Sequence, residues 1–215
     1  MEWYSSIMAE RKSRREINAE ATQRAIVESA ARLFVEQGYA PTTIGQIARE
    51  SGVAVQTIYN AVGSKRDLLI RVLDFAAAGD RAPRTVPSFM QEQAEAEPDP
   101  RKVIALLVDF WRGGLQRTAP IFEVIRQAAA LDPDIAVLET ERGQARLRNY
   151  RLAGRMLAER GDLRHGLTPE AAAAIIFSLG HPESYRLLVL RSGWSTDRWA
   201  AWVTDALVAA LLRDA

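Results

Sequence analysis

Gln56 and Thr57 have side chains that could recognise another molecule. They stand in the stretch IARESGVAVQTIYN, Ile47 to Asn60. A glutamine amide can form two hydrogen bonds with the edge of adenine, and a threonine can contact a thymine methyl group or a phosphate. Such side chains read bases only when a helix carries them into the major groove. The elements around them therefore decide what these residues can do.

Residues for catalysis or metal binding do not form a recognisable set. The 215 residues include no cysteine, and the two histidines, His165 and His181, lie apart in the sequence. Thiolate zinc sites, disulfides and cysteine nucleophiles are therefore ruled out, and metal catalysis is not expected. The serines and aspartates show no spacing that pairs a nucleophile with a base. We expect no catalytic residue, no metal site and no cofactor.

The composition is that of an ordinary globular protein. Hydrophobic residues make up 48% of the chain, charged residues 26%, and the formal net charge is +1. The sequence has no run of about 18 apolar residues and no secretory signal at its start, so we expect a cytoplasmic protein without membrane contact. Arg11, Lys12, Arg14 and Arg15 form a basic cluster. The cluster could meet phosphates as a flexible arm, or it could be a solvated tail.

Apolar residues recur at steps of three and four through most of the chain, which predicts an all-α fold. A first helix is expected from Ala19 to Gln37, with Gly38 ending it in a left-handed conformation. After two short helices, a fourth begins near Ser64. Further helices are expected at Arg101 to Arg117, Pro120 to Leu131, Asp134 to Arg160, Pro169 to Leu179, Pro182 to Arg191 and Thr196 to Leu212.

The spacing of Ala48, Gly52 and Ile58 indicates two short helices that cross at a steep angle. Ala48 must be small where the helices approach, and Gly52 supplies a turn with positive φ. Val53 and Ile58 then anchor the second helix, while Ile47 faces the same core. This pattern predicts a helix-turn-helix whose second helix can enter the major groove of DNA. A structural helical hairpin would show the same offsets, and the spacing alone does not separate the two.

On the helix-turn-helix interpretation, the second helix presents one face to DNA. Val55, Gln56 and Thr57 approach base edges, while Tyr59 and Asn60 point towards the DNA backbone. Gln56 is the best candidate for reading a base, since its amide can pair bidentately with adenine.

Two helix starts are expected to face phosphates. Thr43 with Gln46, and Ser64 with Asp67, each have the spacing of a capping box. Exposed N–H groups and the positive end of the helix dipole favour an anion at such a position, and Lys65 adds a positive charge at the second one.

The stretch from Ala30 to Leu69 resembles the DNA-binding domain of the tetracycline-repressor (TetR) family and its lead into the fourth helix. The matching residues are Phe34, Gly38, Tyr39, Thr42, Thr43, Ile47, Ala48, Gly52, Val53, Ser64 and Lys65. The resemblance covers the whole chain and implies a three-helix domain followed by a helical ligand-binding and dimerisation domain. It also implies that Thr43, Tyr59 and Lys65 contact phosphate.

The chain departs from the family pattern around the second helix of the motif. Ala54 stands where family members commonly carry serine, so a capping hydroxyl worth roughly 1 kcal/mol is missing. Ala61 and Val62 replace the histidine and phenylalanine that often follow the tyrosine. These changes remove an expected phosphate contact and some packing.

We expect three segments: a flexible basic arm at residues 1–18, the DNA-binding domain at 19–80, and the C-terminal domain at 81–215. The prolines, glycine and acidic residues of segment 78–100 suit a linker. The last helix carries an apolar stripe formed by Trp199, Trp202, Val203, Ala206, Leu207, Ala210 and Leu211. The stripe could join two copies in a four-helix interface with the helix near Tyr185 to Val189, or it could pack within its own domain.

A ligand site is expected on the helix from Asp134 to Arg160, where Arg142 and Asn149 interrupt an apolar face shared with Leu138, Ala145, Leu152 and Met156. Polar residues on such a face must pair, reach solvent or hold a ligand. The candidate walls are Phe110, Trp111, Phe122, Arg126, Arg142, Asn149, Tyr150, Phe177 and His181. His181 also suits a helix start, with Pro182 in the first turn.

Together these features predict a homodimeric regulator of transcription that binds a two-fold operator in double-stranded DNA and leaves it when an unknown small-molecule effector binds. Two alternatives stay open. One is a helical protein-interaction or small-molecule-binding module whose helix-turn-helix does not bind DNA, and the other is a helical enzyme, although no acid, base or nucleophile set supports it.

Overall fold

The computed structural model describes residues 13–78, 88, 92 and 96–213. Within these ranges the chain forms helices and no β-strand, apart from an isolated bridge between Leu163 and Leu212. The predicted all-α fold is confirmed. No helix within the described ranges is long and apolar enough to cross a membrane.

The chain divides into two compact units, Met1–Val72 and Leu73–Ala215. The first contains α1 (Arg14–Gln37), α2 (Ile44–Ser51), α3 (Val55–Ala61) and the first part of α4 (Lys65–Ala78). The second contains α6 (Pro100–Ala129), α7 (Pro133–Glu159), α8 (Pro169–Leu179), α9 (Pro182–Tyr185), the π-helical segment η1 (Arg186–Arg191) and α10 (Thr196–Leu211). The domain boundary expected between residues 80 and 81 and most of the expected linker lie outside the described residues, so that division stays a prediction.

The first helix begins at Arg14, earlier than the expected start at Ala19. Ser13 caps it: its hydroxyl accepts a hydrogen bond from Glu16 N (3.2 Å), and the Glu16 carboxylate accepts one from Ser13 N (2.7 Å). This capping box satisfies N–H groups that a helix start leaves without partners. Arg14 therefore lies in α1 and not in an arm, whereas residues 1–12 are outside the described part of the chain.

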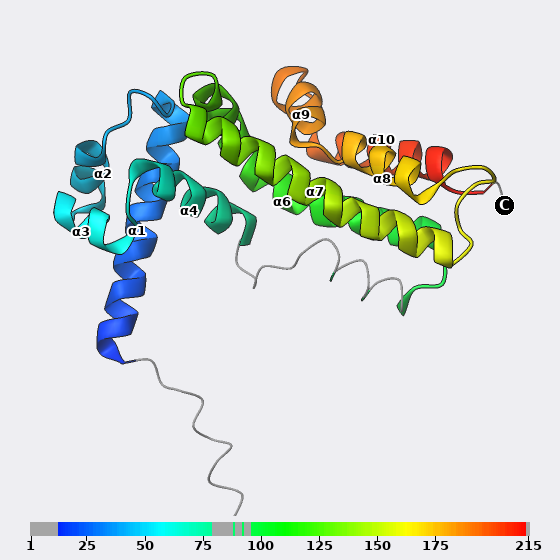
Figure 1. Cartoon of the computed structure of the whole chain (residues 1–215), viewed down its shortest axis with the longest axis horizontal. Helices are drawn as coiled ribbons and strands as arrows, with labels where there is room; N and C mark the ends of the chain where they lie inside the picture. The colour runs from blue at the N-terminus through cyan, green and yellow to red at the C-terminus, as the bar shows by residue number, and fades with distance from the viewer. Residues whose placement is uncertain (1–12, 79–87, 89–91, 93–95, 214–215) are drawn as a thin grey trace, which may run out of the picture. The chain divides into compact units, whose positions relative to one another are not determined.

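The core of the first unit holds α1, α2 and α3 in a fixed arrangement. Phe34, Ile47 and Ile58, one from each helix, are fully buried. Ala48 is buried as expected, and Gly52 ends α2 with a φ of 69°, which a residue with a β-carbon rarely adopts. The helix-turn-helix geometry predicted from these spacings is therefore present, with α2 and α3 beside α1 in Figure 1.

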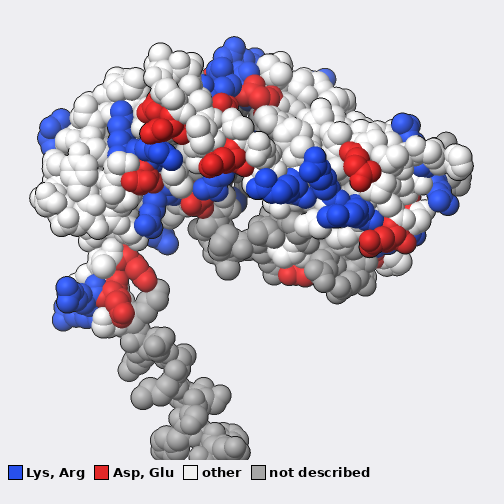
Figure 2. Space-filling view, viewed as in Figure 1, with Lys and Arg blue, Asp and Glu red and all other residues white. Residues whose placement is uncertain are grey.

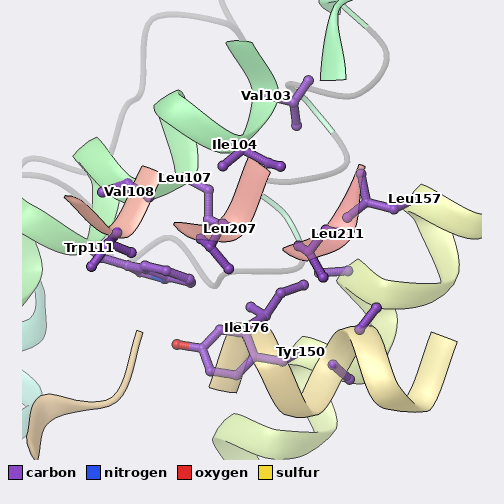
Figure 3. Packing of buried hydrophobic residues seen from close by; sticks show 14 of the residues in the cluster. Val103, Ile104, Leu107, Val108, Trp111, Tyr150, Leu157, Ile176, Leu207 and Leu211 are labelled. Atoms are coloured by element: carbon purple, nitrogen blue, oxygen red, sulfur yellow. The ribbon is translucent and has the colours of Figure 1, made fainter. Parts of the chain in front are cut away.

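The core of the second unit joins α6, α7, α8 and α10. Figure 3 shows Leu107 and Trp111 of α6, Tyr150 of α7 and Ile176 of α8 gathered around Leu207 of α10. Each fully buried side chain of this size contributes about 1.5–3 kcal/mol to folding. The long helices α6 and α7, which lie side by side, form the frame on which the shorter helices pack.

A single 30-residue helix, α6, replaces the two helices expected on either side of Pro120. Proline lacks the N–H that would bond one turn back, and it commonly ends or bends a helix. Here Ala119 and Ile121 on either side are buried, so tertiary packing keeps the helix continuous. The Thr118 hydroxyl also donates to the Gly114 carbonyl (2.9 Å), which occupies a backbone acceptor close to the proline.

Gly180 ends α8 for a reason of packing and not of backbone conformation. Its φ is −83°, which any residue can adopt. A β-carbon built on Gly180 would lie 2.7 Å from the Trp111 ring, closer than real side chains come. The glycine therefore allows the start of α9 to pass next to the Trp111 side chain in the core.

The expected apolar stripe of α10 is divided between two faces. Trp199, Val203, Leu207 and Leu211 are buried in their own domain, as the intradomain alternative requires. Trp202, in contrast, is 40% exposed. Leu187 and Leu190 of η1 are also exposed, so an outward-facing apolar surface remains for the second alternative, contact with another copy.

Candidate functional site

The outer face of α3 is exposed and carries no formal charge. Val55 is 45% exposed and Tyr59 50%, whereas Ile58 on the opposite face is fully buried. Within α3, the Gln56 amide donates a hydrogen bond to the Asn60 side chain (3.0 Å). The surface over α3 is largely white in Figure 2, which marks no Lys, Arg, Asp or Glu there. Contacts with bases would therefore be made by neutral polar and apolar groups. The bond to Asn60 uses one amide N–H of Gln56 and leaves the second N–H and the amide oxygen for a base.

Two adjacent threonines precede α2, and they form different hydrogen bonds. Thr42 is fully buried, and its hydroxyl donates to the Gly38 carbonyl (2.8 Å), which fixes the loop after α1. Thr43 is exposed and caps α2: its hydroxyl accepts from Gln46 N (3.2 Å), and the Gln46 amide oxygen accepts from Thr43 N (2.7 Å). The predicted capping box is confirmed, and it leaves Thr43 at the solvent-exposed end of the helix.

The start of α4 is joined to the loop between α1 and α2. The Lys65 ammonium donates to the Ala40 carbonyl (3.2 Å) and lies 4.2 Å from the centre of the Tyr39 ring. Ser64 and Asp67 form the second predicted capping box, with Ser64 N donating to the carboxylate (2.8 Å) and Asp67 N donating to the Ser64 hydroxyl (3.1 Å). The Ser64 hydroxyl also donates to the carboxylate (2.7 Å), and this bond, followed by the one from Ser64 N, lowers the pKa of Asp67. The positive group of Lys65 is therefore held in the region from which the chain enters α2.

The start of α3 has no side-chain cap. Ala54 occupies the capping position with φ −71° and ψ 148°, the extended conformation in which a serine hydroxyl reaches the N–H groups of the first turn. The alanine supplies no acceptor, as the sequence indicated. The helix that would meet DNA is thus the least well capped of the three in the motif.

Substituting Ala54→Ser is expected to stabilise the first unit by about 0.5–1 kcal/mol, because the backbone is already in the capping conformation. Urea unfolding followed by circular dichroism measures the change. Ala61→Ser, at the other end of α3, offers no N-terminal cap and serves as the control, since it should be neutral or slightly destabilising. Equal stabilities for the two serine variants would contradict the capping argument.

The second unit contains a pocket of about 120 Å³. It is lined by Leu73, Phe122, Ile125, Arg126, Leu138, Glu139, Arg142, Gly143, Arg146, His181, Pro182 and Glu183. These residues come from the end of α4, from α6 and α7, and from the start of α9. Apolar walls with a few charged groups are typical of sites that bind small organic molecules. Within the described part of the chain, no group of His, Asp and Glu side chains could hold a metal ion.

Most charged side chains at the pocket are already paired. Arg126 donates two hydrogen bonds to Glu123 (2.9 and 2.7 Å), and Arg186 donates two to Glu183 (2.9 and 2.6 Å). Arg142 forms an ion pair with Asp74 at 3.0 Å. Hydrogen bonding from Arg126 holds the pKa of Glu123 down at about 2. The same bond raises the pKa of Arg126. Both shifts favour the charged forms of Glu123 and Arg126.

The depressed pKa of Glu123 predicts a loss of stability in acid. The carboxylate stabilises the folded chain above its ordinary pKa of 4.5, and this contribution disappears as the pH falls towards about 2. At pH 7, Glu123→Gln should therefore lower the free energy of unfolding by about 1–2 kcal/mol, and the difference should shrink between pH 5 and pH 2. Urea midpoints measured across this range, with the exposed Glu141→Gln as control, test this. A constant difference at all pH values would contradict it.

Arg146 differs from the other arginines at the pocket because it has no carboxylate partner among the described residues. Its guanidinium lies 4.6 Å from the centre of the Phe122 ring, and its Nε is buried without a hydrogen bond. Burial lowers the pKa of Arg146, although arginine keeps its charge over the physiological range. Burial, followed by the charge of Arg146, lowers the pKa of His181. The histidine is therefore neutral at pH 7, and Arg146 remains a cation that forms no ion pair among the described residues, with Glu139 acting on its charge from farther away.

Four of the nine expected ligand-binding residues line the pocket: Phe122, Arg126, Arg142 and His181. The other five are Phe110, Trp111, Asn149, Tyr150 and Phe177, and they lie elsewhere in the unit. Trp111, Tyr150 and Phe177 form successive edge-to-face ring contacts, with centres 5.6 and 6.1 Å apart, that lead from the core to His181. His181 itself caps α9, accepting a hydrogen bond at Nδ1 from Glu183 N (3.1 Å), as its position before Pro182 indicated.

Arg146 was not predicted as a ligand-binding residue, because the apolar face expected on α7 differs from the face that is buried. Tyr150, Ala153 and Leu157 are buried, whereas Leu152 of the expected face is exposed. Arg146 lies on the buried side, one turn before Tyr150. Arg146, Tyr150, Ala153 and Leu157 follow one another at steps of three and four residues. This helical spacing could have placed Arg146 on the buried face.

Residues 26–72 match the family described as bacterial regulatory proteins, tetR family. The HTH-type transcriptional regulator HbdR of Aromatoleum sp. (strain CIB) is 50% identical over 48 residues, which span 22% of this chain and 21% of HbdR. The region matched to the family contains α2, α3 and the start of α4, where the exposed face of α3 and the two capped helix starts lie.

Solved structures share the fold over most of the chain. NalD, the secondary repressor of the MexAB-OprM multidrug efflux pump in Pseudomonas aeruginosa, is 23% identical with a TM-score of 0.68, covering 93% of this chain and 100% of NalD. A complex of SmeT with triclosan is 20% identical with a TM-score of 0.68, covering 90% of this chain and 93% of SmeT. SmeT represses the SmeDEF multidrug efflux pump of Stenotrophomonas maltophilia. The match to the tetR family is thus limited to the N-terminal helix-turn-helix region, and the solved structures show a shared fold over most of the chain.

Proposed function

We propose that this protein is a repressor of transcription that binds a two-fold DNA operator as a homodimer and leaves it when a small molecule enters the pocket of the second unit. The observation that carries the proposal is the exposed face of α3, set between the capped starts of α2 and α4 in the part of the chain that matches the tetR family. NalD and SmeT are named as repressors, which supports the same direction of regulation.

DNA contacts are assigned to the residues of the motif. Val55, Gln56 and Thr57 would approach the bases, with Tyr59 and Asn60 towards the backbone. Thr43 and Lys65 would bind phosphates at the helix starts. This assignment needs no charged residue on α3, because the positive contribution comes from helix starts and from Lys65.

The homodimer is assigned to the exposed apolar surface of η1 and α10. Leu187, Leu190 and Trp202 are exposed, and a second copy would bury them. A two-fold operator requires two recognition helices about one DNA turn apart, which a dimer supplies. Sedimentation analysis of the full chain and of Trp202→Glu tests this assignment: a wild-type dimer that dissociates in the variant supports it, and a wild-type monomer overturns it.

The small-molecule effector would act through linkage between the two sites. If the effector favours a dimer whose recognition helices are wrongly spaced, DNA must weaken effector binding by the same factor. On this proposal the protein acts in the cytoplasm as a regulator and not as an enzyme.

Fluorescence anisotropy on DNA from the region upstream of the protein's own gene, compared with scrambled DNA, tests the function. We expect specific binding at about 150 mM salt, with affinity falling linearly on a log–log plot against salt concentration. A genome-wide selection of bound fragments covers the case in which the operator lies elsewhere. Equal weak binding to all DNA in both experiments would overturn the proposal and favour an interaction module without a DNA role.

A further inference from the structure

The pocket of the second unit is lined by one arginine, Arg146, that forms no ion pair among the described residues, although the charge of Glu139 acts on it from farther away. Glu123 and Glu183 bind Arg126 and Arg186, and Asp74 binds Arg142. Arg146 has neither a carboxylate within ion-pair distance nor a hydrogen-bond acceptor among the described residues. The Nε of Arg146 is buried without a hydrogen bond, which is costly for a charged group, and a charged group in such a setting is a candidate for binding a ligand of opposite charge.

The guanidinium of Arg146 is oriented by contacts that leave its charge available. It stacks on Phe122, with 4.6 Å between the guanidinium carbon and the ring centre. Stacking on an aromatic face fixes the plane of an arginine without using its hydrogen-bond donors. A planar guanidinium held in this way matches the two oxygen atoms of a carboxylate, which it can bind with two parallel hydrogen bonds.

The remaining walls limit the ligand to a small body of low charge. Leu73, Phe122, Ile125 and Leu138 supply apolar surface. An engineered apolar cavity of about 150 Å³ takes up benzene. The pocket of about 120 Å³ is somewhat smaller, so it limits the ligand body to about one ring or a short alkyl chain. Glu139, which forms no ion pair within the described ranges, also lines the pocket and would repel a second negative charge.

We infer that the pocket binds a small organic monoanion, a carboxylate on an aromatic or short aliphatic body, with Arg146 as the residue that binds the carboxylate. Carboxylate binding in this pocket does not depend on the proposed function. Only the role of that carboxylate as the effector rests on it. The apolar body lies against Phe122 and Leu138, and the carboxylate displaces water from the guanidinium. Neutral His181 adds no competing charge beside it.

Calorimetry on the full-length protein, with two carboxylates and their neutral amides, tests the inference. The probes are benzoate against benzamide and hexanoate against hexanamide, which differ in charge far more than in size. At least one carboxylate should bind roughly 10- to 100-fold more tightly than its amide, the range expected when a buried charge pair is formed. Amides that bind as tightly as both carboxylates, or no carboxylate binding up to about 20 mM, would overturn the inference.

Three variants test whether the effect comes from Arg146. Arg146→Gln should weaken carboxylate binding roughly 10- to 100-fold and leave amide binding unchanged, whereas Arg148→Gln, exposed on the same helix and outside the pocket, should change neither. Glu139→Gln keeps Arg146 in place and should tighten carboxylate binding several-fold, which tests the charge argument even if Arg146→Gln fails to fold. Unchanged carboxylate affinity in Arg146→Gln, or weaker affinity in Glu139→Gln, contradicts it.

Anisotropy on operator DNA with and without the carboxylate separates the two proposals. If the carboxylate binds through Arg146 but DNA affinity stays the same, the pocket is assigned correctly and the effector role is wrong. If the protein binds operator DNA but no carboxylate, the regulator stands and the inferred ligand class fails.

Discussion

Gly154→Ala should lower the free energy of unfolding by about 3 kcal/mol or more, among the largest effects of any single methyl group in this chain. A β-carbon at Gly154 would lie 2.4 Å from the Pro169 carbonyl oxygen and 3.2 Å from Ala173 N. These two backbone atoms are one turn apart at the start of α8, so they cannot rotate away as a side chain would. The methyl group must separate α7 from α8 or break the first turn of α8.

Gly143→Ala on the same helix is the matched control for this experiment. A β-carbon there meets no atom within 4 Å. Alanine should therefore stabilise the helix interior by about 0.8–1 kcal/mol, through backbone propensity alone. Urea unfolding followed by circular dichroism compares both variants with the wild type. If Gly154→Ala is as stable as Gly143→Ala, the close contact between α7 and α8 is wrong.

Helix starts were the part of the fold that the sequence predicted best. The capping pairs Thr43 with Gln46 and Ser64 with Asp67 are both observed. A cap depends on residues three positions apart, and no distant part of the chain is needed to complete it. The turn at Gly52 is local in the same sense, because its positive φ is a property of one residue.

Features that depend on distant packing were predicted less well. Pro120 indicated a break between two helices, yet α6 continues because buried neighbours on both sides stabilise it. In α9 and η1 a single expected helix changes to wider π-type turns from Arg186 onward. The residues themselves show no sign of either outcome, since intrinsic preference is a weak guide once tertiary contacts form.

The pocket was half predicted for a related reason. Arg142 lies on a partly apolar face, and for that reason it was predicted to bind a ligand. In the structure it forms an ion pair with Asp74 at the end of α4. Arg146, four residues later, looked like an ordinary charged residue. Only the packing of Phe122 from α6 and the pairing of its neighbours distinguish it. Charge pairing across helices cannot be read from a single sequence, so the unpaired arginine became visible only in the structure.

Lys65→Glu should weaken operator binding roughly 100-fold, because a phosphate contact is lost and a repulsive charge is introduced beside Asp67. The Lys65 ammonium is held by the Ala40 carbonyl at 3.2 Å, next to the loop that leads into α2. The Lys65 side chain therefore lies near the starts of both α2 and α4, where the protein would meet the DNA backbone. The slope of log affinity against log salt should also fall by about 1, as expected when one phosphate contact is lost.

Two controls separate a DNA contact from a loss of structure or of overall charge. Arg71→Glu changes the net charge by the same amount on an exposed position of α4, and it should weaken binding only slightly. Lys65→Met removes the charge without adding a negative one, and a loss of roughly 10-fold is expected. Anisotropy across a salt series measures all three variants, with thermal unfolding and sedimentation to confirm an intact dimer. If Lys65→Glu and Arg71→Glu weaken binding equally, the effect comes from overall charge and the phosphate contact assigned to Lys65 is wrong.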